Sequence, residues 1–495
     1  MTASTQEAAD AGVEILRAGG NAVDAAVAAA LATSVADPCN VGIGGYGGFM
    51  VVHHPAWPGA RCVQFPLCAP LDLPREGLAR AYPEEGPECS SMPGVVAGLA
   101  AALRDFGTFD WARVSAPAIR LCRGGVAATD LVRRAFEQNR HRGVIGECFE
   151  VEPDAARGFV FRQEALASTL ERLAEKGPEW FYEGPLGDAA CRAWRAGGVE
   201  VAPDEWRGHP QTVEVLDAPH YDAGDVRLFA PALELTGSPC VFATFEAAVR
   251  LGPASLARDD GMAELAVAMA GIWQHRFAGA GGNDFAAIDL RSWVEAALAR
   301  REDAGAPARE VGHTAHLNAA DASGMIAALS ATQGHAWFGG RWAIPGTGVI
   351  MNAGMHGFTQ GATARRGART IGVSNMSPTI ARARGGERVA LGCPGARRIP
   401  SNVGLVLARH FLCGAPLQPA VSAGRFHAEE RHRARYEAGR APQGFVDALR
   451  RRFPAVEPQP ADDYYGPLSA LRVSDAGAVE AAVDDREARA SHAFA

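Results

Sequence analysis

Thr314 is the residue of this 495-residue chain whose surroundings best suit nucleophilic chemistry. It begins a strand-like segment directly after residues 301–312, a polar stretch of small residues that predicts an exposed linker. If the peptide bond between His313 and Thr314 were cut, one residue would carry a hydroxyl and a new α-amine. An α-amine with an ordinary pKa near ~8 can take the hydroxyl proton, so Thr314 would be both nucleophile and base. Spacing alone favours the simpler interpretation, in which Thr314 is a β-branched residue in its preferred place at a strand start.

The elements that must position this residue indicate a layered protein. Residues 316–332 alternate strand, an Asp-Ala-Ser-Gly turn and strand, which predicts a hairpin. Further short strands are predicted at 49–52, 348–351, 379–380 and 389–391, and several between 201 and 239. Helical periodicity covers 6–35 with a break at 19–21, and then 95–106, 111–122, 166–176, 262–277, 403–412 and 445–453. Because helices and strands come in blocks, the pattern favours a layered sheet with helices outside over a doubly wound parallel sheet.

The glycine-rich run at residues 42–48, GIGGYGG, superficially suggests a dinucleotide-binding loop. Such a loop needs the order strand, glycines, helix, whereas here the glycines precede the strand at 49–52. We interpret the run as a tight turn that leads into a central strand.

Composition excludes several classes of protein. Apolar residues make up 48% and charged residues 21% of the chain, as in soluble globular proteins, and the net charge of -8 argues against a nucleic-acid binder. The ten cysteines form no CxxC pair, and no histidine cluster has zinc-site spacing, so we expect neither a metal nor another cofactor. The first residues show no basic and apolar leader and no membrane anchor, which predicts a cytoplasmic protein.

Many ordered motifs resemble the γ-glutamyltranspeptidase family of N-terminal-nucleophile hydrolases. In the first part they are ILRAGGNAVDAAVAAALATSVADP, GIGGYGGFM, SMPGVVAGL, GTF, APAIRL and FYEG. In the second part they are the Thr-Ala-His triplet at 314–316, PGTGVIMN at 345–352, SNMSPTI at 374–380, GCPGARRI at 392–399, and YYGPLSAL near the end. The resemblance covers most of the chain and implies an αββα sandwich with helices on both outer faces.

The resemblance also implies roles for individual residues. Thr314 would be both the residue released by self-cleavage and the mature nucleophile, and Thr332 the second hydroxyl that assists it. Eighteen residues are enough for two strands and a turn, which returns the second hydroxyl to the first on one sheet face. The backbone N–H groups of Gly395 and Ala396 would stabilise the tetrahedral oxyanion, provided that the alanine can adopt the required backbone angles.

Self-cleavage would divide the precursor into a large chain, residues 1–313, and a small chain, residues 314–495. Because the central sheet would be shared between them, we expect the two chains to remain together as one folded unit.

The segments that would bind a γ-glutamyl group depart from the family pattern. A γ-glutamyl donor presents an α-carboxylate and an α-amine, and a buried pocket must pair both charges. The expected Arg falls at Pro66, and the expected acidic position falls among Gly354 and Gly357. Other substitutions are Gly334 for an Asn, Asn375 in the Ser374 pair, and Ala315 for the second threonine. We therefore assign substrate contacts to Ser374, Asn375, His316, Gly334 and Gly357, with His313, His335, His356, Arg397 and Arg398 as further groups that could bind a differently shaped acid.

These features predict a self-processed hydrolase that acts on a small amino-acid-derived substrate other than ordinary glutathione. Three alternatives stay open. The first is a hydrolase of a carbon-carbon bond in an antibiotic pathway that makes alkylated proline units, as some relatives are implied to be. The second is a true γ-glutamyl transferase or hydrolase whose charge-pairing groups come from elsewhere. The third is an uncleaved, inactive scaffold.

Overall fold

A computed structural model describes residues 1–495 except 72, 74–76, 157, 232–235, 280–287, 300–312, 335, 360–362, 367–368, 461–463, 487–490 and 495. The linker expected at 301–312 and the side chains of His313 and His335 therefore lie outside the described part.

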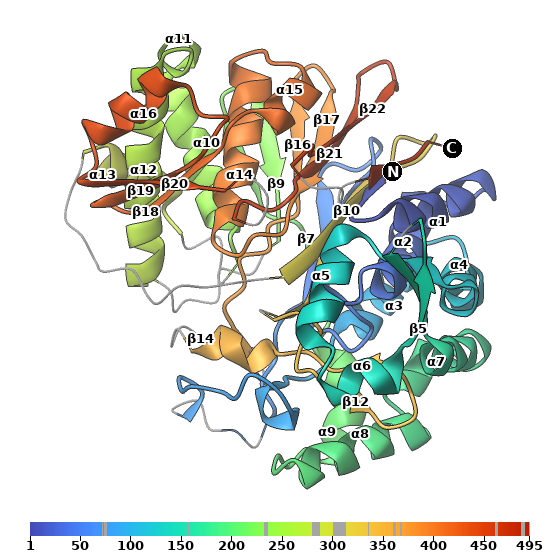
Figure 1. The fold of residues 1–495 in the computed structure, drawn as a ribbon. Helices are drawn as coiled ribbons and strands as arrows, with labels where there is room; N and C mark the ends of the chain where they lie inside the picture. Colours follow the sequence, from blue (N-terminus) through green and yellow to red (C-terminus); the bar gives the residue numbers. More distant parts are fainter. Residues whose placement is uncertain are drawn as a thin grey trace.

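Two antiparallel sheets form the centre of the molecule (Figure 1). The first sheet has the strand order β23 (Ser491–His492), β1 (Thr2–Ala3), β10 (His313–Ala320), β11 (Ile326–Gly334), β2 (Gly47–His53), β3 (Ala60–Phe65) and β7 (Glu214–Asp217). The second has the order β22 (Val479–Val483), β21 (Ser469–Val473), β17 (Arg388–Gly392), β16 (Thr379–Ala383), β9 (Val226–Phe229) and β8 (His220–Ala223). The first sheet therefore contains strands from both sides of the expected cleavage point.

A small apolar cluster joins the two sheets face to face. Its members come from strands of both sheets or lie beside them: Val51, Ala60, Cys62, Ala218, Phe229, Ile326, Ala328, Ile380, Ala390, Leu471 and Val473. Each sheet also buries its other face under helices, because alternate residues of a strand point to opposite faces.

Helices cover the outer face of the first sheet. They include α1 (Gln6–Arg17), α2 (Ala22–Ala36), α3 (Val95–Phe106) and α4 (Trp111–Gly124), which share one apolar core with that sheet. Every residue of α2 is buried, and its alanines let neighbouring elements approach closely. Asn21 begins α2 with a capping box that involves Asp24.

A second set of helices covers the outer face of the other sheet. It comprises α10 (Ser238–Leu251), α12 (Asp259–Gly279), α13 (Leu290–Leu298), α14 (Arg398–Leu407), α15 (Leu417–Ser422) and α16 (Gln443–Arg450), which pack into a separate apolar core. Figure 1 shows the two helical layers on opposite sides of the paired sheets. The expected αββα sandwich is confirmed.

Smaller elements surround this frame. Short strands form β4 (Val126–Ala127), β5 (Glu150–Asp154), β6 (Gly158–Arg162), β12 (Ala343–Ile344), β13 (Val349–Ile350), β14 (Thr363–Arg366), β15 (Arg369–Gly372), β18 (Phe426–Glu430), β19 (Arg433–Glu437) and β20 (Ala455–Gln459). The remaining α-helices are α5 (Asp130–Asn139), α6 (Gly143–Cys148), α7 (Glu164–Lys176), α8 (Gly184–Ala196), α9 (Pro203–Gly208) and α11 (Pro253–Leu256).

Two sequence expectations need correction. The region 201–239, expected as short strands, opens with the helix α9 before β7, β8 and β9. Pro203 occupies the first turn of that helix, where its missing N–H does no harm. The helix α8 was not anticipated, because glycines at 184 and 187 weaken its helical pattern.

Some features concern the chain as a whole. Over the described residues, no helix combines the length and apolar character needed to cross a bilayer. The same part of the chain contains no group of three or more His, Cys, Asp or Glu side chains that could hold a metal ion. All ten cysteines are free thiols, and Cys413 is the exposed one.

Candidate active site

Thr314 lies in a β-bulge at the start of β10. Ala315 pairs with Ala331 and His313 pairs with Gly334, so the register shifts by one residue between these two pairs. The shift leaves Thr314 opposite the segment that contains Thr332. Bulges of this kind change the direction of a side chain and often occur beside active sites. The structure thus brings together the two threonines that the eighteen-residue spacing predicted to be neighbours.

Alternation along the hairpin shows which way Thr332 faces. Ala315 and Ala331 pack in the core beneath the helices of the first layer. Thr332, which neighbours Ala331 in the chain, therefore faces the second sheet, whereas the direction of Thr314 is set by the bulge in which it lies. Thr314 and Thr332 are both buried, with 7% and 1% of their surfaces exposed. The hydroxyl of Thr332 also accepts a hydrogen bond of 3.1 Å from the N–H of Gly334.

Two glycines of the run at 42–48 pack against the strand that carries Thr332. A Cβ at Gly45 would lie 2.7 Å from the carbonyl oxygen of Thr332, and one at Gly48 would lie 2.2 Å from that of Ser330. Both distances are too short for any side chain, so these positions need glycine. The run serves close backbone packing next to Thr332, consistent with its interpretation as a turn into a strand.

His316 is buried between the sheets and uses both ring nitrogens. Its Nε2 lies 3.0 Å from Asn318 Oδ1, and its Nδ1 lies 2.9 Å from Ser330 Oγ. Asn318 donates through Nδ2 to Thr2 Oγ1 and to Ser469, so its Oδ1 is the acceptor and His316 Nε2 carries the proton. Burial lowers the pKa of His316 to about 4, which keeps the ring neutral at neutral pH. The predicted role of His316 in substrate binding is not favoured by these contacts, which make it a support for β10.

The loop that carries the predicted oxyanion donors connects β17 to α14. Gly395 has φ 128° and Ala396 has φ 51°, so the alanine adopts the left-handed region despite its side chain. Among the described residues, neither N–H of this pair has a hydrogen-bond acceptor. Ala396 is buried and precedes Arg397, the N-cap of α14, so it lies near a helix start, where the helix dipole favours negative charge. Two buried N–H donors at a helix start can stabilise an oxyanion.

The course of β17 brings this loop to the Thr314 end of the site. Ala390 belongs to the apolar cluster between the sheets, and Gly392 lies against the ring of His316, where a Cβ would come within 2.5 Å of a ring carbon. Arg388, at the start of β17, donates to the carbonyl of Gly324 at the hairpin turn, so β17 runs from the turn toward the Thr314 end of β10. Because Thr314 lies two residues beyond His316 on β10, the loop and the threonine approach each other across the sheets.

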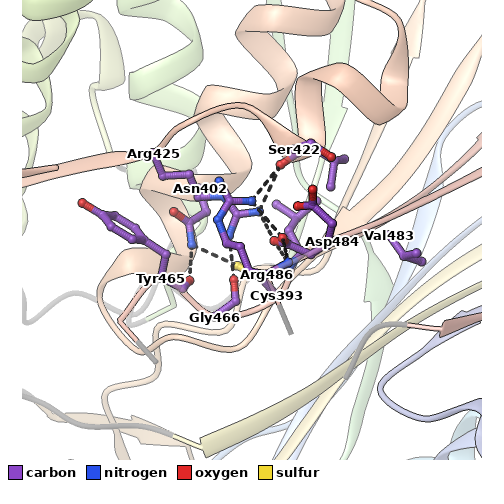
Figure 2. A network of polar contacts seen from close by, with 12 residues as sticks. Cys393, Asn402, Ser422, Arg425, Tyr465, Gly466, Val483, Asp484 and Arg486 are labelled. Carbon is purple, nitrogen blue, oxygen red and sulfur yellow. Dashed lines mark hydrogen bonds and ion pairs between the residues drawn. The ribbon is translucent and has the colours of Figure 1, made fainter. Parts of the chain in front are cut away.

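A network of polar contacts supports the loop of residues 393–397, which is called the oxyanion loop below (Figure 2). A Cβ at Gly395 would lie 2.9 Å from the carbonyl oxygen of Tyr465, so the loop rests directly on this residue. Asn402 Nδ2 donates a hydrogen bond of 2.5 Å to the same carbonyl. Arg425 Nη1 donates a hydrogen bond of 2.6 Å to the carbonyl of Gly466. Side chains from the second helical layer thus fix the segment on which the oxyanion loop lies.

Buried ion pairs hold Arg425 in turn. Arg425 pairs with Asp484, which also accepts from Arg486 Nη1 at 2.8 Å. Arg486 Nη2 contacts Glu437 at 2.6 Å, and these four side chains have no exposed surface. Removing one partner from such a set leaves a buried charge unpaired, which typically destabilises a protein by about 3–5 kcal/mol.

On the recognition side of the site, Leu67 occupies the space next to two glycines. A Cβ at Gly354 would lie 2.7 Å from Leu67 Cδ1, and one at Gly357 would lie 2.4 Å from Leu67 Cδ2. No larger residue fits at Gly357 while Leu67 keeps its position. The segment joins the threonine end through Gly334, which forms a bridge with Ala353. Leu67 and the neighbouring segment of Pro66 form an apolar surface, called the wall below. This surface lies where the family pattern has charge-pairing side chains.

Ser374 and Asn375 are buried on a loop that accepts hydrogen bonds from an arginine side chain. Arg276, from α12, donates through Nη2 to the carbonyl of Ser374 at 3.2 Å and to Asn375 Oδ1 at 3.5 Å. Sequence reasoning missed Arg276, since nothing in the pattern of α12 links this residue to a loop a hundred positions later. The contacts show that positive charge lies behind the loop expected to bind the substrate.

The remaining groups that were predicted to bind an acid contact other parts of the protein. Arg397 pairs with Glu429 at 3.3 Å, and Arg398 donates through Nε to the carbonyl of Tyr464 at 3.0 Å. His356 lies 3.1 Å from the carbonyl of Pro83. Arg369, whose strand lies beside Leu67, pairs with Glu205.

A known protein family matches this chain along most of its length. The family model of gamma-glutamyltranspeptidase matches residues 8–244 and 258–494. The chain belongs to the gamma-glutamyltranspeptidase family. It is therefore an enzyme of this kind, an N-terminal-nucleophile hydrolase.

Relatives within the gamma-glutamyltranspeptidase family carry two kinds of name. A glutathione hydrolase proenzyme of Pseudomonas sp. (strain A14) is 28% identical over 481 residues, covering 85% of this chain and 80% of the relative. An acylase ACY 1 proenzyme of Pseudomonas sp. (strain SE83) is 30% identical over 459 residues, covering 85% and 81%. The crystal structure of cephalosporin acylase from Bacillus halodurans has a TM-score of 0.86 at 21% identity, covering 100% of this chain and 95% of that one, and shows the same fold.

Proposed function

We propose that this enzyme is self-processed between His313 and Thr314 and that the freed Thr314 attacks a small amino-acid-derived substrate other than ordinary glutathione. The observation that carries the proposal is the bulge that sets Thr314 opposite Thr332, with the donors of Gly395 and Ala396 on the facing loop. This arrangement of β10, β11 and the loop before α14 supports the proposed roles of nucleophile, assisting hydroxyl and oxyanion donors.

The proposed reaction needs only these groups and water. The α-amine of Thr314 takes the hydroxyl proton as Oγ1 attacks the substrate carbonyl, and the oxyanion forms beside the N–H groups of Gly395 and Ala396. The protonated amine returns the proton to the leaving nitrogen as the carbon-nitrogen bond breaks, which leaves an ester on Thr314. Water then attacks the ester in the same way, gives the carboxylic acid and restores the threonine.

Leu67 supports a substrate without the full charge pattern of a γ-glutamyl group. A buried α-amine without an acidic partner would lose several kcal/mol through desolvation. The wall beside Gly357 offers the apolar side chain of Leu67 at the place where the family pattern expects that acid. The acyl part of the substrate is therefore expected to lack a free α-amine, while the cation behind Ser374 still favours an acidic group.

An acylase activity is a second candidate, favoured by the 30% identical acylase relative and by the same apolar wall. Both candidates can be compared with one set of p-nitroanilides. Glutaryl-p-nitroanilide lacks only the α-amine of γ-glutamyl-p-nitroanilide, and butyryl-p-nitroanilide also lacks the carboxylate. We expect the glutaryl compound to be cleaved with a kcat/KM at least tenfold above that of the γ-glutamyl compound. A preference for butyryl would favour the acylase, and a preference for γ-glutamyl would overturn the assigned specificity.

Processing is tested on the same preparation. Intact mass spectrometry is expected to show fragments of residues 1–313 and 314–495, and N-terminal sequencing of the smaller one should begin with Thr-Ala-His. An active, continuous polypeptide would overturn the mechanism, and an inactive one would favour a scaffold.

A further inference from the structure

A pocket of about 380 Å³ lies in the outer helical layer of the second sheet, away from the threonine pair. It is bounded by the start of α12, the π-helical turn Ala408–Leu412, the start of β18 and the start of α16. Its lining includes Leu256, Met262, Arg409, Cys413, Phe426 and Phe445. The volume falls within the range of small-molecule sites, and π-helical turns frequently occur at functional positions.

Arg409 brings a positive charge to this mostly apolar lining. Its Nη2 donates a hydrogen bond of 2.5 Å to the carbonyl of Gly424. Its Nη1 is buried and has no hydrogen-bond partner. In the part of the chain that the structure describes, no carboxylate lies within ion-pair distance of Arg409. An arginine without a counter-ion that lines a pocket makes the pocket suited to an added anion.

The acids nearest to Arg409 are already paired with other arginines. The network of Figure 2 and its neighbours join Glu437, Asp484 and Asp485 to Arg425, Arg440 and Arg486. Burial, with the nearby charges of Arg425 and Arg486, lowers the pKa of Arg409 to about 10, so the group stays cationic at neutral pH. Among the described arginines of this region, Arg409 is the one without an ion-pair partner.

One further acid lines the pocket. Asp259 is exposed at the start of α12, and its Oδ2 lies against Gly444, where a Cβ would come within 2.2 Å of that oxygen. In this position the carboxylate contacts the start of α16 and the solvent. Because its charge is screened by water, Asp259 does not neutralise Arg409 on the inner side of the pocket.

We propose that this pocket binds a small carboxylic acid with an apolar chain, whose carboxylate accepts hydrogen bonds from Arg409 and whose chain contacts Phe426 and Phe445. Arg409 lines the pocket, so the carboxylate would supply the counter-ion that this arginine lacks among the described residues. The apolar lining would bury the chain, which adds affinity beyond that of a simple anion.

Isothermal titration with sodium octanoate tests the proposal on the full-length protein. We expect saturable binding to the wild type and at least tenfold weaker binding to Arg409→Met. The matched control is Arg384→Met, which removes an arginine with 82% of its side chain exposed and should bind as the wild type does. Octanol and inorganic phosphate should each bind at least tenfold more weakly than octanoate. Binding that is absent, equal for octanol, equal for phosphate, or unchanged in Arg409→Met would overturn the proposal.

A second measurement does not depend on the folding of a variant. Cys413 lines the pocket and is the exposed thiol of the chain, so N-ethylmaleimide should modify it first. Octanoate is expected to slow this alkylation severalfold, measured by intact mass, while octanol at the same concentration leaves the rate unchanged. Cys413→Ser should take up no fast adduct, which assigns the signal. Equal slowing by both compounds, or by neither, would contradict a carboxylate site.

Discussion

The catalytic end of the site and the wall beside Leu67 are built in different ways. At the proposed catalytic end, main-chain geometry does most of the positioning: a bulge places Thr314, and the backbone of residues 395–396 carries the proposed oxyanion donors. At the wall, side-chain volume decides, because Leu67 fills the space beside Gly357. The difference teaches that this fold keeps its reaction through buried backbone structure, whereas recognition depends on a few side chains that can change without loss of the fold.

Buried polar groups explain why the catalytic end is hard to alter. His316 joins β10 to β11, and Arg425 with Asn402 holds the segment beneath the oxyanion loop. Each substitution in these groups would leave a buried donor, acceptor or charge unpaired. At the wall, by contrast, exchanging Leu67 for a smaller residue removes only apolar contacts.

The largest effect is expected for Thr314→Ala, which removes the nucleophile at the catalytic end. Turnover should fall by about 10⁴-fold or more, and the precursor should remain one chain of 495 residues. Thr314→Ser is the matched control, since it keeps a hydroxyl and an amine, and it should retain partial processing and activity. Intact mass and the anilide assay measure both outcomes. Continued cleavage in Thr314→Ala would assign the nucleophile to another residue.

The next effect concerns the backbone of Ala396. Its φ of 51° is strongly disfavoured for a β-branched residue, so Ala396→Val should displace the N–H and reduce kcat by about 10²- to 10³-fold. Ala396→Gly keeps the N–H and removes the side chain that disfavours the left-handed conformation. Activity in this control should stay within about twofold of the wild type. A kcat in Ala396→Val equal to that of Ala396→Gly would show that this N–H does not face the reacting carbonyl.

A change of pH probes the support beneath the nucleophile. The pKa of His316 is lowered from 6.5 to about 4, so the unfolded chain binds a proton more readily than the folded one between these values. The stabilisation from a neutral His316 is complete above pH 6.5 and decreases by up to a few kcal/mol as the pH falls through about 4.

Melting temperatures between pH 7.5 and 4.5 measure this effect. The wild type should lose stability on acidification, and His316→Gln should show a shallower decline. His141→Gln, which changes an exposed histidine, is the control and should follow the wild type. An identical pH profile in His316→Gln would mean that other buried groups, such as His53 and His209, dominate the acid response.

The sequence predicted the catalytic end better than the wall. Thr314 and Thr332 lie on one hairpin, so their approach follows from local periodicity and the turn at residues 321–324. The bulge is a one-residue shift between β10 and β11 that the alternation of apolar and polar residues does not mark. Contacts of Leu67 with Gly357, and of Arg276 with Ser374, join segments far apart in the chain. A single sequence contains no local pattern that specifies which distant side chains will meet.

The smallest effect is expected at the wall, where Leu67→Ala combined with Gly357→Asp should restore an acidic partner for an α-amine. The φ of Gly357 lies outside the left-handed region, so an aspartate can adopt the backbone, and the smaller alanine side chain at position 67 removes the 2.4 Å contact. We expect kcat/KM for γ-glutamyl-p-nitroanilide to rise about tenfold, which corresponds to ~1.4 kcal/mol, while that for the glutaryl compound does not rise. Leu67→Ala alone is the matched control and should leave the preference unchanged, whereas Gly357→Asp alone should lower the melting temperature through its clash with Leu67. If Leu67→Ala alone shifted the preference as far as the double variant, access rather than charge would determine selectivity, and the wall would act only by volume.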